Sequence, residues 1–162
     1  MTVALYDDNA EVPWRRISPR LASARRIGLL LAYLPFLLAT AVLAATVSRW
    51  LWGLPGVVAA LFLWQFWLIG RQVSAISYAE LPEEIVIRRG RLFRRLVSIP
   101  YGRLQYADMG SGPLERHFGL ASVTIHTASP ASGGRVPGLE LPAAEALRER
   151  LTARGEAQRA GL

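Results

Sequence analysis

The sequence contains no cysteine and no lysine. Without cysteine, the chain can form neither a disulfide nor a thiolate metal site. Without lysine, all 19 basic residues are arginine. Each arginine carries a planar guanidinium that can donate two parallel hydrogen bonds to one phosphate or carboxylate group. Cationic recognition by this chain, whose formal net charge is +7, therefore depends on arginine alone.

Residues suited to catalysis are also scarce. The two histidines, His117 and His126, do not have the four-residue spacing of a helical metal pair. We expect His117 in a turn and His126 on the solvent-facing side of a strand. Gly110-Ser111-Gly112 lacks the Lys-Ser/Thr pair of a phosphate-binding loop, and Ser111 lacks the flanking motif of a hydrolase nucleophile. We predict no catalytic residue, no metal site and no cofactor, so an anchored enzyme is the least favoured class.

Charge is almost absent from residues 27–70, in which Arg49 is the one charged side chain. Residues 27–48 and 50–70 are long apolar runs. As a helix, the first run would be about 33 Å long, and the hydrocarbon core of a bilayer is about 30 Å thick. A secretory signal has a shorter apolar run and no second span, and the helices of a soluble core carry a polar face. The pattern therefore predicts a two-helix transmembrane hairpin.

Arginines flank this apolar region on both sides. Five precede the first run and four follow the second, whereas the connecting turn contains Arg49 alone: Arg15, Arg16, Arg20, Arg25 and Arg26, then Arg71, Arg88, Arg89 and Arg91. Because arginine-rich loops are retained in the cytoplasm, both termini are predicted to be cytoplasmic in a multi-pass protein of the cell membrane. The same flanks account for the basic net charge, so no nucleic-acid partner is predicted.

After residue 74 the sequence changes to short β-rich runs separated by glycine and proline. Ile85 and Ile87 alternate with other residues in the way that is typical of a half-buried strand. The alternation predicts strands at 84–89, 91–99, 103–109, 120–127 and 135–141.

A C-terminal amphipathic helix is predicted to follow from Pro142, because an apolar stripe is formed by Ala143, Leu147 and Leu151 together with Ala144 and Ala146, and Gly155 is a suitable end. The stripe must be buried against the sheet, which gives an α+β domain. The predicted organisation is a cytoplasmic N-terminal segment (1–26), the two-span hairpin (27–70), a folded domain (75–155) and a frayed tail (156–162).

The most distinctive motifs lie between Ile99 and Ala128: IPYGRLQ at 99–105 and GPLERHFGLASVTIHTA at 112–128. Together with LPEEIVIRRGRLFRR at 81–95, they resemble the bacterial membrane proteins with a pleckstrin-homology-like (PH-like) domain, the YdbS-like proteins. The resemblance implies a PH-like antiparallel β-barrel capped by a C-terminal helix. It also implies seven strands, more than the alternation marks, and residues 74–79 would supply the missing first strand. It implies no catalytic residue and no established ligand.

One cluster of charged residues stands out as a candidate site. Five arginines surround the turn at Gly90: Arg88, Arg89, Arg91, Arg94 and Arg95. On a hairpin close to the membrane, each could gain about 1 kcal/mol from an anionic lipid surface. The alternative is a solvated basic hairpin that only helps to set the topology. Lipid-headgroup or partner contact is the predicted role of this cluster.

These observations predict a non-enzymatic, membrane-anchored binding or scaffold module at the inner leaflet. Its expected partners are membrane lipids and a protein, which could be a second copy of the chain. The alternative function is an accessory subunit of a membrane transport or envelope-stress complex that acts through its spans.

Overall fold

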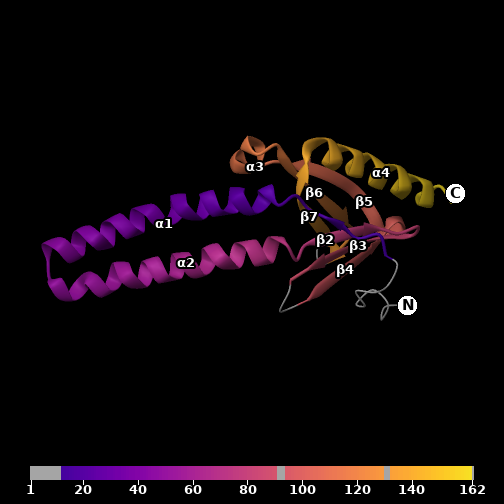
Figure 1. The fold of residues 1–162 in the computed structure, drawn as a ribbon. Coiled ribbons are helices and arrows are strands. Elements are labelled where there is room, and N and C mark those ends of the chain that lie inside the picture. Colours follow the sequence, from indigo (N-terminus) through magenta and orange to yellow (C-terminus); the bar gives the residue numbers. More distant parts are fainter. Residues whose placement is uncertain (1–11, 91–93, 130–131, 162) are drawn as a thin grey trace.

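The computed structural model describes residues 12–90, 94–129 and 132–161. Two long helices, α1 (Arg20–Thr46) and α2 (Gly53–Val73), lie side by side and project from a β-rich domain (Figure 1). A short 3-10 turn, η1 (Arg49–Trp52), joins them. Only 6% of the most apolar window of each helix is buried, unlike a helix in a soluble core. Both helices are long and apolar enough to cross a bilayer, which agrees with the predicted hairpin.

The β-rich domain consists of two antiparallel sheets. The first contains, in spatial order, β1 (Arg15–Arg16), β2 (Ser77–Glu80), β3 (Glu84–Arg89) and β4 (Arg95–Pro100). A 3-10 turn, η2 (Tyr101–Arg103), leads into the second sheet, which contains β5 (Leu104–Gly110), β6 (Leu120–Thr127) and β7 (Gly134–Glu140). A short helix, α3 (Pro113–His117), lies between β5 and β6, and α4 (Leu141–Arg159) follows β7.

The two sheets do not close into the predicted barrel. Among the described residues, β4 pairs with β3 alone and β5 pairs with β6 alone. The chain turns through η2 between these two strands, so it enters a separate sheet without extending the first one. The prediction of antiparallel sheets followed by a C-terminal helix is confirmed. The prediction of a closed barrel is wrong, because the structure is open between β4 and β5.

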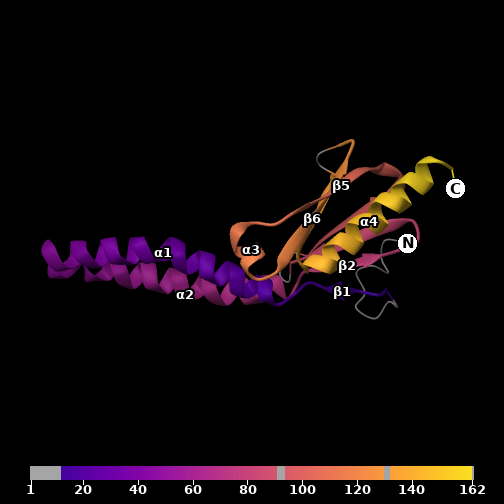
Figure 2. The ribbon, with the colours of Figure 1, turned by 90° about the horizontal axis from the view of Figure 1, so that it is seen from above.

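The core lies between the two sheets and α4. It contains Ile85 and Ile87 of β3, Ile125 of β6, and Leu147 and Leu151 of α4, all at most 1% exposed. Figure 2 shows α4 alongside the strands, with its C-terminal end directed away from the transmembrane helices. α4 packs against η2 and β5, where its apolar stripe is covered.

Two details of α4 differ from the sequence prediction. Of the predicted apolar stripe, Ala144, Leu147 and Leu151 are buried, whereas Ala143 is exposed. The helix also continues past Gly155 to Arg159. Gly155 is buried, and a Cβ atom there would lie 3.2 Å from Leu104 Cδ2. This glycine therefore permits close packing of the helix on β5 and does not end the helix.

The helical hairpin and the domain share one core. Leu21 of α1 and Val73 of α2 belong to the core cluster, as does Ile17 in the segment before α1. Gly138 of β7 has φ +66°, and a Cβ atom there would lie 2.7 Å from Leu21 Cδ2. Its carbonyl accepts a 2.9 Å hydrogen bond from the Ser18 N–H. The folded core therefore extends beyond residues 75–155.

Candidate functional site

The arginines around Gly90 are divided between the two faces of the β3–β4 hairpin. Successive side chains of a strand point to opposite faces, so Arg88 and Arg89 diverge. Arg89 is the cross-strand partner of Arg95, and Arg88 is the partner of Ser77 on β2. Arg91 lies outside the described residues. The predicted single cluster is thus, in the described part of the chain, two clusters separated by the sheet.

The outer cluster lies beside the end of α2. Its groove has a volume of about 660 Å³ and is lined by Trp14, Arg16, Ser74, Ala75, Ser77, Arg88, Gly90 and Arg94. The Arg88 guanidinium lies 4.6 Å from the centre of the Trp14 ring, and its Nε donates a 3.3 Å hydrogen bond to Ser77 Oγ. We call this hollow the outer groove. Ser74 and Ala75 directly follow α2, so the groove lies next to the point where the chain leaves that helix.

The inner cluster lies between the two sheets, on their open side. A cleft of about 740 Å³ is lined there by Arg89, Arg95 and Arg135, by apolar side chains including Ile87, Val97 and Ile125, and by the rings of Tyr106 and His126. The two rings are stacked, with centroids 4.3 Å apart and an interplanar angle of 12°. We call this hollow the inter-sheet cleft. It is the direct consequence of the unpaired edges of β4 and β5.

The inter-sheet cleft has a positive electrostatic character. Burial lowers the pKa of the Arg89 guanidinium, and the charges of Arg135, Arg25 and Arg95 lower it further. A guanidinium remains protonated at neutral pH even so. Among the described residues, no carboxylate lies within ion-pair distance of Arg89 or Arg95, and the nearest acid to Arg135 is Glu115 at 4.0 Å. A bound anion would relieve the repulsion among these cations.

The two histidines lie on different elements. His126 is on β6, where its Nε2 lies 3.3 Å from Asp108 Oδ2. His117 is exposed on α3 and meets the Phe118 ring edge-on. Within the described ranges, no three His, Asp or Glu side chains are grouped so that they could hold a metal ion. Neither histidine forms part of a recognisable catalytic arrangement in this part of the chain.

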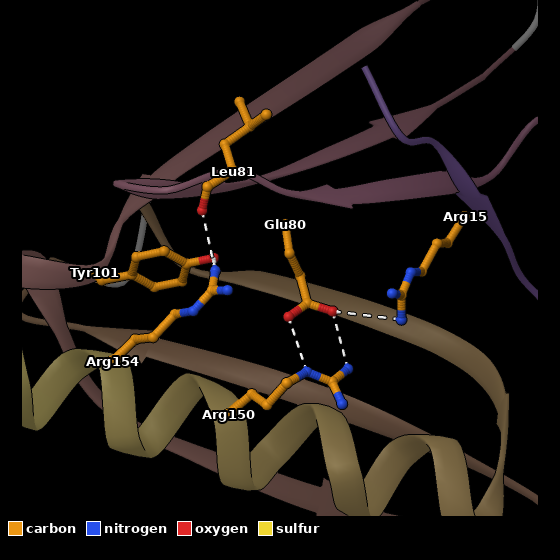
Figure 3. A network of polar contacts seen from close by, with 6 residues as sticks. All are labelled: Arg15, Glu80, Leu81, Tyr101, Arg150 and Arg154. Carbon is orange, nitrogen blue, oxygen red and sulfur yellow. Dashed lines mark hydrogen bonds and ion pairs between the residues drawn. The ribbon is translucent and has the colours of Figure 1, made fainter. Parts of the chain in front are cut away.

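A second polar cluster connects α4 to β1 and β2 (Figure 3). Glu80 accepts two 2.9 Å hydrogen bonds from Arg150 and lies 3.8 Å from Arg15. Arg154 donates to the Leu81 carbonyl at 3.0 Å and to the Tyr101 hydroxyl at 2.8 Å. Arg150 and Arg154 of α4 thereby donate hydrogen bonds to the Glu80 carboxylate, the Leu81 carbonyl and the Tyr101 hydroxyl. This network holds α4 against the first sheet.

The network makes stability dependent on pH. Burial alone would raise the pKa of Glu80, but the hydrogen bonds and charge of Arg150, with Arg15 and Arg154, lower it below 4.5. A lowered carboxyl pKa contributes stability above the unfolded value, and the contribution is lost as pH falls through the folded value. We expect Glu80→Gln to reduce the free energy of unfolding of the full chain in detergent by about 1.5–3 kcal/mol at pH 7. The difference from wild type should shrink towards zero as pH falls below 4.5.

Glu83→Gln is the matched control for this prediction. Glu83 is exposed and is separated from Glu80 by two residues. Its substitution removes the same charge without breaking the ion pair between Glu80 and Arg150. The free energy of unfolding at pH 7 should therefore change by less than about 0.5 kcal/mol. Equal effects of the two substitutions at pH 7 would show that the network does not stabilise the docking of α4.

Sequence reasoning missed two arginines whose charges act on the Arg89 guanidinium, of which Arg135 also lines the inter-sheet cleft. Arg25 belongs to α1 and Arg135 to β7, and both are distant in sequence from the turn at Gly90. A signal for Arg89 and Arg95 was present in the sequence. Residues that pair across a hairpin point to the same face, so pairing of residues 89 and 95 around the turn at Gly90 indicates a shared face for their side chains. Nothing in the sequence indicates that β7 and α1 bring further arginines close to Arg89.

Comparisons with known proteins agree with this architecture. The profile of the family described as bacterial PH domain matches residues 21–155. The UPF0699 transmembrane protein YdbS of Bacillus subtilis (strain 168) is 29% identical over 114 residues, which cover 64% of this chain and 67% of that protein. No solved structure matches the chain. With its two apolar helices, this membrane protein belongs to the bacterial PH domain family.

Proposed function

We propose that this protein is a non-enzymatic binding module that the helical hairpin anchors at the inner leaflet, where its basic hairpin contacts anionic lipid headgroups. The residues of this contact would be Arg88, Arg89, Arg91, Arg94 and Arg95, as the sequence predicted. The observation that carries the proposal is the position of the outer groove next to the end of α2. A cationic surface tethered at that position lies within a Debye length of the headgroups.

Contacts at the ends of the helices support this position relative to the membrane. The Arg26 guanidinium lies 4.5 Å from the centre of the Phe66 ring, and that of Arg71 lies 4.5 Å from the Trp67 ring. Arginine and tryptophan are both typical of the interface between hydrocarbon and water. A Cβ atom on Gly70 would lie 2.6 Å from Arg26 Nη2, so the two helices meet at one level there. A headgroup layer at this level would adjoin the domain.

The proposal predicts that the full chain prefers anionic lipid. In mixed nanodiscs of phosphatidylglycerol and phosphatidylcholine, wild type should retain phosphatidylglycerol after detergent extraction, as measured by mass spectrometry. The triple substitution of Arg16, Arg88 and Arg94 by Gln, all of which line the outer groove, should reduce the enrichment about tenfold or more, because each cation near the surface contributes about 1 kcal/mol. Raising the salt concentration from about 0.1 M to 0.5 M should reduce the wild-type enrichment as well.

A second triple variant tests whether the effect depends on where the positive charge is removed or only on how much is removed. Arg103, Arg148 and Arg159 are exposed and do not line the outer groove, and α4, which carries two of them, runs away from the hairpin helices in Figure 1. Their substitution by Gln removes the same charge and should leave the enrichment within about twofold of wild type. If wild type shows no preference for phosphatidylglycerol at low salt, the arginines are only a solvated surface.

A further inference from the structure

The inter-sheet cleft combines two properties that a simple cationic surface does not need. One is a set of three arginines from different strands: Arg89 on β3, Arg95 on β4 and Arg135 on β7. The other is an apolar floor, in which Ile87 and Ile125 are buried and Val97 is half-buried. The volume of about 740 Å³ is typical of a site for a small molecule.

The charges of the cleft are unbalanced. No acidic side chain is among the residues that line it, and the carboxylates nearest to its polar groups are Glu115, beside Arg135, and Asp108, beside His126. Arg135 also donates a 2.7 Å hydrogen bond to Ser122 Oγ, which lies outside the lining of the cleft, and its charge adds to those of Arg89 and Arg95. Three guanidinium groups around one hollow form a suitable environment for a phosphate, which accepts paired hydrogen bonds from each.

The floor of the cleft is shaped by a glycine. A Cβ atom on Gly134 would lie 2.8 Å from the Cδ1 atoms of both Ile87 and Ile99. A larger residue at this position would displace the isoleucine side chains that form the floor. The open edges of β4 and β5 then leave Val97 accessible on one side and Tyr106 on the other.

We propose that the inter-sheet cleft binds one alkyl phosphate, with the phosphate held by Arg89, Arg95 and Arg135 and the alkyl chain against Ile87, Val97 and Ile125. A lipid from the adjoining leaflet and a soluble phosphate ester share this chemistry. The inference deepens the proposed function. It rests on that function because a domain held at the membrane has lipid close to the cleft. It differs in requiring both an anionic group and an apolar chain.

The test uses the full chain in phosphatidylcholine nanodiscs and isothermal titration calorimetry with three probes. Hexyl phosphate carries both groups, inorganic phosphate carries only the anion, and hexanol carries only the chain. We expect hexyl phosphate to bind about tenfold or more tightly than inorganic phosphate, because the floor covers several methylene groups. Empty nanodiscs correct for partitioning into the bilayer, and hexanol should show no binding beyond that correction.

Three variants assign the binding to the cleft. The double substitution Arg89→Gln and Arg95→Gln should lower the affinity for hexyl phosphate about tenfold or more. The control double substitution Arg103→Gln and Arg148→Gln should leave the affinity unchanged. Val97→Thr, which keeps the side-chain shape, should lower the affinity for hexyl phosphate but not the affinity for inorganic phosphate. The cleft double variant should melt at or above the wild-type temperature without ligand, because it removes two of the mutually repelling cations.

The outcomes are distinguishable from those of the lipid-retention experiment. Equal affinities for hexyl phosphate and inorganic phosphate, no binding of either, or an unchanged affinity in the cleft double variant would overturn the inference. Lipid enrichment could persist in each of these cases, since it needs only surface cations. Conversely, binding of hexyl phosphate without lipid enrichment would support the cleft and contradict the proposed function.

A further arm identifies the source of the phosphate. The titration is repeated in nanodiscs that contain phosphatidylglycerol. A lower affinity for hexyl phosphate there indicates that lipid from the bilayer occupies the cleft, and an unchanged affinity indicates a soluble phosphate ester. Both results of this arm support an alkyl phosphate in the cleft and differ only in its source.

Discussion

Leu147→Asp is expected to unfold the β-rich domain while the hairpin helices remain inserted. The Leu147 side chain is fully buried between α4 and the sheets. Removing a buried leucine side chain costs about 2–5 kcal/mol, and burying a carboxylate without a partner adds a further penalty. The total stability of a small domain is about 5–15 kcal/mol, so this single change is comparable to the whole. Thermal unfolding of the full chain in detergent, followed by circular dichroism, measures the loss.

Ala143→Asp is the matched control on the same helix. Ala143 is exposed one turn earlier, near the N-terminus of α4, where a negative charge is favourable. Its substitution should change the melting temperature by no more than a few degrees. If Leu147→Asp and Ala143→Asp melt alike, α4 does not cover the core in the way the structure shows.

The local elements were largely predictable from the sequence. The strands at 84–89 and 120–127 have the predicted bounds, because both combine clear alternation with flanking residues that end a strand. The two apolar helices follow from length and hydropathy. β1 was not predicted, because Arg15–Arg16 is too short to show any alternation and its strand conformation depends on pairing with β2. α3 was read as part of a loop for a similar reason: it has five residues.

Tertiary arrangement was less predictable. Ala143 and Ala144 are both apolar, and only the docked position of α4 decides which of them is buried. Closure of the sheets depends on the path of η2 between β4 and β5, which no local pattern encodes. The separation of Arg88 from Arg89 follows from strand geometry, but the approach of Arg135 and Arg25 to Arg89 depends on long-range packing.

The orientation of the hairpin is the second prediction with an all-or-none outcome. Arginine is concentrated at the end of the hairpin that continues into the domain, which favours a cytoplasmic domain. Trp50 is 90% exposed and Trp52 is 57% exposed at the opposite end, and tryptophan is typical of a membrane interface. The domain is therefore expected on the cytoplasmic side, with the turn at η1 on the other side.

The absence of cysteine makes this orientation directly measurable, because each introduced cysteine is the single thiol of the chain. Val47→Cys places it beside the turn between the helices, and Ala143→Cys places it on the exposed surface of α4; both side chains are exposed. Both should react with maleimide after solubilisation in detergent, which confirms their accessibility. Neither position contributes to the core, so both variants should fold.

The most direct test of a domain held at the inner leaflet is labelling of these two variants with a membrane-impermeant maleimide in intact, expressing bacterial cells. We expect the Val47→Cys variant to be labelled in intact cells and the Ala143→Cys variant only after the cell membrane is permeabilised. Labelling of Ala143→Cys in intact cells, with Val47→Cys protected until permeabilisation, would place the domain outside the cytoplasm and contradict the proposed function.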